Sequence, residues 1–543
     1  LMGLIFTNLI YSLVFFALTI KELITDRYDH DIDQFMYFGS RILHNELIWV
    51  KEFDDKSPVV QYIFSLPAAL KSTNIFVLIT LIVSIVGIYL GYLMLKDILE
   101  NSLLIINKRE KNIILYFGTI LYLTLLVCIY GSLHHINAIS SSLCLISISL
   151  SYLNKEKDNR LLMNISAISS AICISIRPYY LLNIMLIPMW LNTRDIETRS
   201  NEQNKNRIKI YKEYIKKQIV WITIITFYIV VFNVTPYIIS GNTSDFIYGI
   251  KLNSIDYIDH NIFQRQYINI GKNPILYPII LGIIILPLTR IVFRNILYKY
   301  FKSKENGLII LYKFDTDLIF FGIINPILLE IMFYRKHFFG HYFTLFSPYI
   351  LISTVLLLAI LSRLNRVITI NNIYKITLKN SFILLLIICL ITNQNLPNEI
   401  DQITNKHISK KSYKVKIIKE FLDKEKISNG SLGFLAPENN YIHWKLDESR
   451  HGFPQKAVYR NIYNGKMDNL INKNQNLNYK FLLPTTTQLC ETLKTSAPEY
   501  VITEKNDFSF NCLKQNSSKY KLLTVTPTLN IDNIFIFKRS NEQ

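Results

Sequence analysis

Apolar runs separated by short polar segments occupy almost the first four hundred positions of the chain. Most of these runs come close to the roughly 20 residues that an α-helix needs to cross a bilayer. We therefore expect a polytopic α-helical membrane protein with about eleven spans, whose transmembrane domain covers residues 1–393. The predicted spans are Leu4–Ile20, Asn74–Leu95, Asn112–Tyr130, Ile136–Leu153, Leu161–Ile176, Tyr179–Leu191, Gln218–Ser240, Pro274–Phe293, Thr316–Phe333, Tyr342–Ser362 and Asn380–Asn393.

Two features of this pattern affect the topology. The first run continues without a small-residue cleavage site, so we interpret it as a retained helix. The short runs on either side of Arg177-Pro178 fit either two tilted spans or one re-entrant hairpin.

Basic residues fall in alternate loops, which the positive-inside rule makes cytoplasmic. They lie at Lys96–Lys111, Lys155–Arg160, Arg194–Lys217, Arg294–Lys313 and Arg363–Lys379. With a cytoplasmic amino terminus, the first outer loop at residues 21–73 and the region after residue 393 are then extracytoplasmic. This parity requires two spans around Arg177.

The region 394–543 is polar and carries short strand-like runs at Tyr500–Thr503 and Ile534–Phe537, which predict a small extracytoplasmic α/β domain. Its two cysteines, Cys490 and Cys512, can form a disulfide in an oxidising compartment. The other four cysteines lie inside apolar runs without CxxC spacing, which disfavours a zinc site.

Composition and charge agree with a membrane protein. Half of the residues are hydrophobic, and the formal net charge is +19. Because Lys and Arg concentrate in the short loops between spans, topology accounts for the positive charge, and no nucleic-acid partner is expected.

The first outer loop carries most of the interpretable chemistry. The carboxylates of Asp29, Asp31 and Asp33 cluster at the start of a series of apolar positions at helical spacing from Ile32 to Leu47. This pattern predicts an amphipathic helix in the membrane interface, with Asp33 in its first turn. A carboxylate there stays ionised beside the positive end of the helix, which suits a base or a cation ligand. An N-cap role for an aspartate is the structural alternative.

Ser57-Pro58 predicts the start of a second helix, with Ser57 as N-cap and Pro58 at the first helical position. Lys56 would then stand beside free backbone amides, a combination that suits an anion such as a lipid phosphate. An interfacial lysine that only extends toward the headgroups is the alternative.

A second polar cluster, Tyr334–Tyr342, lies between two apolar runs and contains Arg335 and His341. Charge in such a place is a functional candidate, and an arginine fork suits phosphate. Interfacial anchoring is the alternative. For His134, His135 and Arg177, at other outward turns, we favour a structural interpretation. A weaker group that could supply a second carboxylate comprises Asp256, Asp259 and His260.

Together these residues resemble the GT-C class of integral-membrane glycosyltransferases, in the bacterial branch that includes aminoarabinose transferases and protein O-mannosyltransferases. The resemblance covers residues 1–393, and the remainder matches only as a periplasmic domain. It rests on an acidic residue four positions before a tyrosine, an amphipathic helix, an Asp-x-Lys-x-Pro motif, and a later arginine and His-Tyr before a proline. These positions are Asp33, Tyr37, Asp54, Lys56, Pro58, Arg335, His341, Tyr342 and Pro348.

The resemblance implies an inverting glycosyltransferase in a bacterial inner membrane, with a polyprenyl-phosphate sugar as donor and an extracytoplasmic lipid, glycan or protein as acceptor. Asp33 is then the expected catalytic residue, with Asp29 and Asp31 as competing candidates for the same role. Donor-binding residues by the same resemblance are Lys56, Arg335, His341, Tyr342, Asp31 and Asp55.

Asp31-Ile32-Asp33 also resembles a DxD metal motif, which leaves Mg²⁺ or Mn²⁺ as an open cofactor. No nucleotide or redox cofactor is expected, because nucleotide sugars are cytoplasmic and this loop faces outward. Two alternative functions remain. A polysaccharide polymerase or ligase would not need the pattern from Asp33 to Lys56, and a transporter would bury its polar groups near the middle of the membrane.

Overall fold

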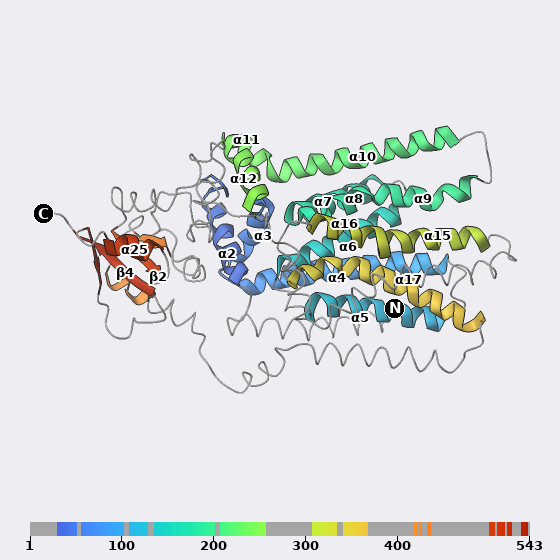
Figure 1. The fold of residues 1–543 in the computed structure, drawn as a ribbon, viewed down its shortest axis with the longest axis horizontal. Helices are drawn as coiled ribbons and strands as arrows, with labels where there is room; N and C mark the ends of the chain where they lie inside the picture. The colour runs from blue at the N-terminus through green and yellow to red at the C-terminus, as the bar shows by residue number, and fades with distance from the viewer. Residues whose placement is uncertain are drawn as a thin grey trace, which may run out of the picture. The chain divides into compact units, whose positions relative to one another are not determined.

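The computed structural model shows a mostly helical chain with one four-stranded sheet formed by residues near the carboxyl terminus (Figure 1). The structure describes residues 30–50, 56–101, 108–128, 135–155, 157, 159–200, 207–256, 307–333, 340–367, 418–421, 423–425, 432–435, 499–504, 508–515, 519–523 and 534–540. The chain divides into two compact units. The first unit comprises Leu1–Thr19, Val77–Val231 and Tyr257–Lys406, and the second comprises Ile20–Phe76, Phe232–Asp256 and His407–Gln543.

The first unit is a bundle of helices that run alongside one another (Figure 1). In it α6 packs against α7, α5 against α17, and α9 against α15. Its elements are α4 (Thr73–Glu100, of which Thr73 to Phe76 belong to the second unit), α5 (Lys108–Cys128), α6 (Ile136–Asn154), α7 (Arg160–Ile176), η2 (Pro178–Tyr180), α8 (Leu181–Met185), α9 (Ile187–Ser200), α10 (Arg207–Asn233, of which Phe232 and Asn233 belong to the second unit), α15 (Gly307–Ile319), the π-helical turn η3 (Phe320–Ile324), α16 (Asn325–Phe333), the 3₁₀ turn η4 (Gly340–Phe346) and α17 (Ser347–Val367).

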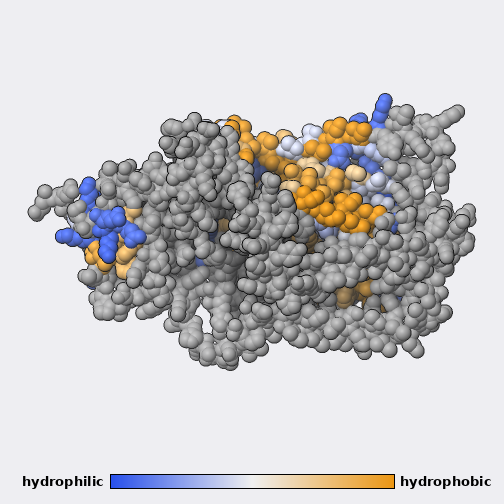
Figure 2. Space-filling model, viewed as in Figure 1, coloured by the Kyte–Doolittle hydropathy of each residue, from blue (hydrophilic) through white to orange (hydrophobic). Residues whose placement is uncertain are grey.

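This protein is a membrane protein. Among the described residues, three helices are long and apolar enough to cross a bilayer: Thr73–Glu100, Ile136–Asn154 and Lys212–Asn233. The last is part of α10 and keeps large apolar side chains exposed, including Ile215 and Phe227. Figure 2 shows hydrophobic residues on the face in view, over α10 and the neighbouring helices of the bundle. Because exposed apolar surface on this scale is unfavourable in water, it indicates contact with lipid.

Most described helices coincide with predicted spans, and three boundaries differ for local reasons. The span predicted over Gln218–Ser240 ends at Asn233, and Pro236 opens a separate short helix, α11 (Thr235–Ile239). The span predicted from Thr316 begins earlier, at Gly307, and continues through η3 into α16. The span predicted from Tyr342 starts as the 3₁₀ turn η4, and its α-helix begins at Ser347. The spans predicted over Leu4–Ile20, Pro274–Phe293 and Asn380–Asn393 lie outside the described residues.

Serine side chains join the central helices. Ser84 and Ser142 hydroxyls lie 3.0 Å apart between α4 and α6, and Ser151 and Ser166 lie 2.9 Å apart between α6 and α7. Ser141 binds the carbonyl of Thr344 in η4 at 2.8 Å. Small residues let helix backbones approach, and such interhelical hydrogen bonds replace the hydrophobic driving force that lipid does not supply.

The segment around Arg177 crosses the bundle twice. Arg177, after α7, bonds Asn137 near the start of α6, whereas Arg194, in α9, bonds Tyr152 near the end of α6. The 15 residues between Asn137 and Tyr152 span about 22 Å of helix. The chain therefore returns along α6 between Arg177 and Arg194, which favours two spans over a re-entrant hairpin.

The helical part of the second unit contains α2 (His30–Leu43), α3 (Pro58–Ala69), α11 and α12 (Thr243–Asp256). α2 and α3 pack closely because Gly39 lies against the backbone of Phe64. The predicted helix from Ile32 to Leu47 ends four residues early, and Asn45 and Trp49 adopt positive φ angles of 60° and 70°.

The sequence predicts α2 as an amphipathic helix in the membrane interface, but in the structure most of its residues are buried. Ile32, Asp33 and all residues from Phe35 to Ser40 are buried. The expected polar side is partly internal as well, because Arg41 forms an ion pair with Glu46 just after the helix. α2 is therefore enclosed by protein on most of its circumference.

The carboxyl-terminal part of the second unit holds a sheet with strand order β1-β2-β4-β3. Its elements are β1 (Leu432–Leu435), β2 (Tyr500–Glu504), α25 (Phe508–Gln515), β3 (Tyr520–Leu522) and β4 (Ile534–Arg539). β1 pairs parallel to β2, whereas β4 pairs antiparallel to both β2 and β3. The two runs predicted as strands are β2 and β4. Cys512 is buried and disulfide-bonded, and Cys490 lies outside the described residues.

Candidate functional site

Asp33 occupies the first turn of α2, as predicted, and only 3% of it is exposed. Tyr37 and Arg41 follow at intervals of four residues on the same side of the helix, and the Arg41 guanidinium lies 5.8 Å from the centre of the Tyr37 ring. The positive end of the α2 dipole favours the ionised form of a carboxylate in this position. Asp33 is thus a buried carboxylate at a helix start, a setting that suits a base or an acceptor-orienting group.

Lys56 and α3 approach α2 through aromatic residues. The Lys56 ammonium lies 5.8 Å from the centre of the Phe35 ring, two residues beyond Asp33. Phe35 contacts Phe64 of α3, and Phe64 stacks on Phe76. Lys56 therefore lies beside the α2–α3 pair, and α2 of that pair carries Asp33.

Two hydroxyl groups near the start of α3 are buried without a described hydrogen-bond partner. Ser57 is its N-cap by backbone conformation, and Pro58 is its first residue, as predicted. The Ser57 hydroxyl does not cap the helix, and among the described residues neither it nor the buried Tyr62 hydroxyl has a hydrogen-bond partner. Burial raises the pKa of Tyr62 to about 12. Tyr62 is therefore a neutral hydroxyl at physiological pH.

The loop between α2 and α3 is fixed at several points. The Gln61 side chain accepts from the Ile48 amide at 3.1 Å and donates to the Glu46 carbonyl at 2.8 Å. Tyr237 of α11 donates to the Ile48 carbonyl, and Trp49 packs against Phe246 of α12. These contacts hold residues 46–49 against α3, α11 and α12.

The metal hypothesis has no independent support in the described residues. Within them, no group of three potential His, Cys, Asp or Glu ligands gathers. The Asp33 side chain is described, whereas the Asp31 side chain is outside the described part. The residues that could hold a divalent cation therefore remain the two aspartates of the DxD motif.

A second polar group lies in the first unit, where α7 ends and α6 begins. Arg177 is 5% exposed; its Nε donates to Asn137, and its guanidinium lies 5.3 Å from the centre of the Tyr342 ring. Tyr342 is buried and meets Tyr179 edge to face at 5.8 Å. The His135 Nδ1 accepts from the Asn137 amide at 3.1 Å, so this nitrogen carries no proton.

The contacts of Arg177 compensate its burial only in part. A desolvated cation–π contact contributes about 2 kcal/mol, whereas a buried ion loses several kcal/mol of hydration. The carboxyl end of α7 favours a cation at Arg177, but the amino end of α6 at Asn137 disfavours it. No carboxylate whose side chain the structure describes contacts the guanidinium.

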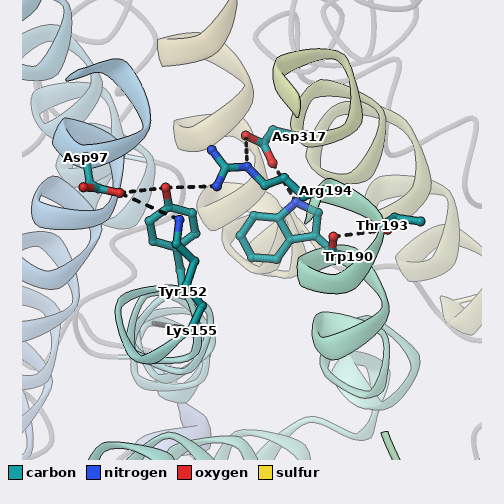
Figure 3. A network of polar contacts seen from close by, with 7 residues as sticks. All are labelled: Asp97, Tyr152, Lys155, Trp190, Thr193, Arg194 and Asp317. Atoms are coloured by element: carbon teal, nitrogen blue, oxygen red, sulfur yellow. Dashed lines mark hydrogen bonds and ion pairs between the residues drawn. The ribbon is translucent and has the colours of Figure 1, made fainter. Parts of the chain in front are cut away.

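A third polar group, the Asp317 network, lies near the opposite end of α6. Figure 3 shows the Tyr152 hydroxyl between the carboxylate of Asp97 and the guanidinium of Arg194, at 2.8 and 3.1 Å. Arg194 Nε donates to Asp317 at 3.0 Å, and the Trp190 indole donates to the other Asp317 oxygen at 2.8 Å. The network joins helices α4, α6, α9 and α15, so its immediate effect is to hold the bundle together at this end.

Comparison with solved structures finds four similar chains. One is the crystal structure of ArnT from Cupriavidus metallidurans bound to undecaprenyl phosphate, with a TM-score of 0.50, 10% sequence identity and coverage of 98% of each chain. The chain has the GT-C fold. No protein-family model matches the sequence, and the comparison with curated proteins finds no match.

The GT-C fold distributes the predicted site residues over both units. Asp33 and Lys56 belong to the second unit, and Tyr342 belongs to the first, where it supports Arg177. His341 lies in η4 with an undescribed side chain. Arg335 and Asp55 lie outside the described residues, as do Asp54, His134, Asp259 and His260.

The structural interpretation of Arg177 stays a prediction; the structure buries this residue at the end of α7, next to Pro178. One feature was missed from sequence. The Asp317 network was not predicted at all. Asp317 is an acidic residue inside a predicted span, and that position alone could have marked it.

Proposed function

We propose that this protein is a membrane glycosyltransferase that transfers a sugar from a polyprenyl phosphate to an extracytoplasmic lipid, glycan or protein, with inversion at the anomeric carbon. The observation that carries the proposal is the pairing of α2 with α3, which brings the buried carboxylate of Asp33 and the ammonium of Lys56 to one helix pair. The GT-C fold supports it, and the ArnT structure of that fold contains undecaprenyl phosphate.

In the proposed reaction, Asp33 accepts a proton from the acceptor nucleophile or orients it for attack on the anomeric carbon. The bond from that carbon to the phosphate oxygen breaks, and the electron pair leaves with the polyprenyl phosphate. Lys56, beside the start of α3, stabilises the charge that develops there. Arg335, His341, Tyr342, Asp31 and Asp55 are the further residues proposed for donor binding.

The proposed orientation places the amino terminus in the cytoplasm of a bacterial cell and the active site and carboxyl-terminal domain outside the inner membrane. Two observations support it. Lys96, Lys155 and Arg194 lie near the same end of the bundle, around Asp97 and Tyr152, as the positive-inside rule requires for cytoplasmic loops. Cys512 is disulfide-bonded, which is typical of an oxidising compartment.

The test is transfer of labelled sugar from defined polyprenyl-phosphate donors by the full-length protein in membranes. We expect Asp33→Asn to lower turnover about a hundredfold or more, because a positioned base contributes roughly 10²- to 10⁴-fold. Asp245→Asn, which changes another first-turn carboxylate of the second unit, is the matched control and should retain activity. Full turnover by Asp33→Asn would remove this aspartate from the mechanism, and equal rates with and without chelator would remove the metal hypothesis.

A further inference from the structure

Arg177 and Arg194 are equally buried arginines of one unit with different partners. Both are 5% exposed. Arg194 has the Asp317 carboxylate and the Tyr152 hydroxyl. Arg177 has one amide oxygen and one ring face, and its two terminal nitrogens bond to no described residue. A structural arginine would resemble Arg194, so the contrast indicates that Arg177 has another partner during function.

The contacts of Arg177 leave one edge of the guanidinium available. Asn137 accepts from Nε, and the Tyr342 ring covers the guanidinium. Asn137 is itself held by His135, and Tyr342 by Tyr179. The Nη1–Nη2 edge is therefore a fixed fork, the geometry in which arginine binds two oxygens of one anion.

The backbone reinforces this preference. α6, a helix of 19 residues, begins at Ile136, one residue before Asn137. Its positive end and the guanidinium both favour a negative group nearby. Because Arg177 is only 5% exposed, its charge is screened less than that of a residue on an exposed surface.

We propose that Arg177 binds a phosphate group through its Nη1–Nη2 edge, with Asn137 and Tyr342 as positioning residues. The identity of the ligand rests on the proposed function, in which this phosphate is that of the polyprenyl donor or product. The anion site itself rests only on the burial and contacts of Arg177.

The experiment measures binding and thermal unfolding of the full-length protein in nanodiscs, with undecaprenyl phosphate, undecaprenol and inorganic phosphate as probes. We expect undecaprenyl phosphate, but not undecaprenol, to stabilise the wild type. Arg177→Gln should raise the dissociation constant about tenfold to a hundredfold, because it removes a charge-assisted contact. Arg177→Lys, which keeps the charge without the fork, should recover part of the affinity.

The ligand-free proteins distinguish a binding role from a structural one. If Arg177 serves a ligand, Arg177→Gln removes an uncompensated buried charge and leaves the unfolding temperature unchanged or higher. If Arg177 is structural, the same change lowers that temperature and leaves affinity unchanged, which would overturn the proposal. Arg160→Gln, an exposed arginine at the opposite end of α7, is the control and should alter neither quantity.

Parallel measurements on Lys56→Gln separate this inference from the proposed function. Loss of undecaprenyl phosphate binding in Lys56→Gln, with wild-type binding in Arg177→Gln, refutes the Arg177 site and leaves the proposed donor intact. Arg177-dependent binding of inorganic phosphate, without binding of the lipid, supports the anion site and contradicts the lipid donor. Failure of the wild type to bind either phosphate overturns both.

Discussion

At the residue scale, the neighbours of a buried polar side chain decide what it can do. Asp33, Arg177 and Asp317 are all nearly inaccessible, yet their neighbours differ. Asp317 is bonded to Arg194 and Trp190, which satisfies it inside the bundle. Arg177 lacks a carboxylate partner among described side chains, and Asp33 lies at a helix start in the other unit. The first arrangement stabilises the fold, and the other two suit binding and catalysis.

Tyr62 gives a prediction at this scale. Its pKa is raised from 10.0 to about 12 because burial disfavours the phenolate. The unfolded tyrosine ionises first, so its contribution to stability is complete below about pH 10 and is lost as the pH rises through about 12. We expect Tyr62→Phe to lose less stability than the wild type between these values, measured as the shift of the unfolding temperature.

Tyr62→Phe also tests the state of the hydroxyl at neutral pH. Removal of a buried hydroxyl without a hydrogen-bond partner among the described residues should leave stability at pH 7 unchanged or slightly higher. If the unfolding temperatures of Tyr62→Phe and the wild type change equally with pH, Tyr62 is not the titrating group.

At the scale of elements, the α2–α3 pair is the part that organises the proposed site. Gly39 allows the contact, because a Cβ there would lie 2.5 Å from the backbone carbonyl carbon and oxygen of Phe64. Phe35, Phe64 and Phe76 then form a continuous aromatic contact under Lys56. The position of Lys56 relative to α2 thus depends on one residue without a side chain.

We expect Gly39→Ala to separate α2 from α3 and to destabilise the protein by about 1–3 kcal/mol, the usual range for overpacking. The rate of sugar transfer should fall by a larger factor than the loss of folded protein explains, because the change displaces the proposed catalytic helix. The assay compares transfer rates and unfolding temperatures with those of Gly322→Ala, where an added Cβ has an ordinary 3.4 Å contact with the Ser353 hydroxyl. Equal activity of the two variants would mean that the close helix contact is dispensable.

At the scale of the whole molecule, two types of polar contact organise the first unit. Serine pairs run along α6 and join it to α4 and α7. The Asp317 network joins four helices near one end of α6 (Figure 3), and Arg177 lies near the other end. The end opposite the Asp317 network therefore holds Arg177, the arginine for which we propose a phosphate ligand.

The Asp317 network predicts strong coupling between its charged members. Arg194→Met should destabilise the protein by about 3–5 kcal/mol, because it leaves a buried carboxylate without its counter-charge. Asp317→Asn, which keeps an acceptor for Trp190, combined with Arg194→Met should recover most of that loss. Unfolding of the two single variants and the double variant gives the coupling energy.

The exposed pair Lys96–Glu100, at 3.9 Å, provides the control. Lys96→Met should change stability by less than about 1 kcal/mol, as for other surface ion pairs. An effect of Arg194→Met no larger than that of Lys96→Met would contradict a stabilising role for the network.

The sequence by itself determined the features that depend on local chemistry. Apolar runs predicted α4, α6 and α7, Ser57-Pro58 predicted the start of α3, and the spacing from Ile32 predicted α2 with Asp33 in its first turn. These predictions succeeded because helix periodicity and capping involve residues a few positions apart. The resemblance to GT-C glycosyltransferases was carried by motifs in the first outer loop and by the later element with Arg335 and His341-Tyr342, and the fold agrees with it.

Only the tertiary structure decided which distant residues meet. Arg194 and Asp317 are 123 positions apart, and Ser141 and Ser347 are 206 apart. It also showed that Arg177 is buried against Tyr342, that α2 is enclosed, and that the chain crosses the bundle twice around Arg177. The physical reason is that the ionisation and partners of a buried group depend on packing between helices, which periodicity along one segment does not encode.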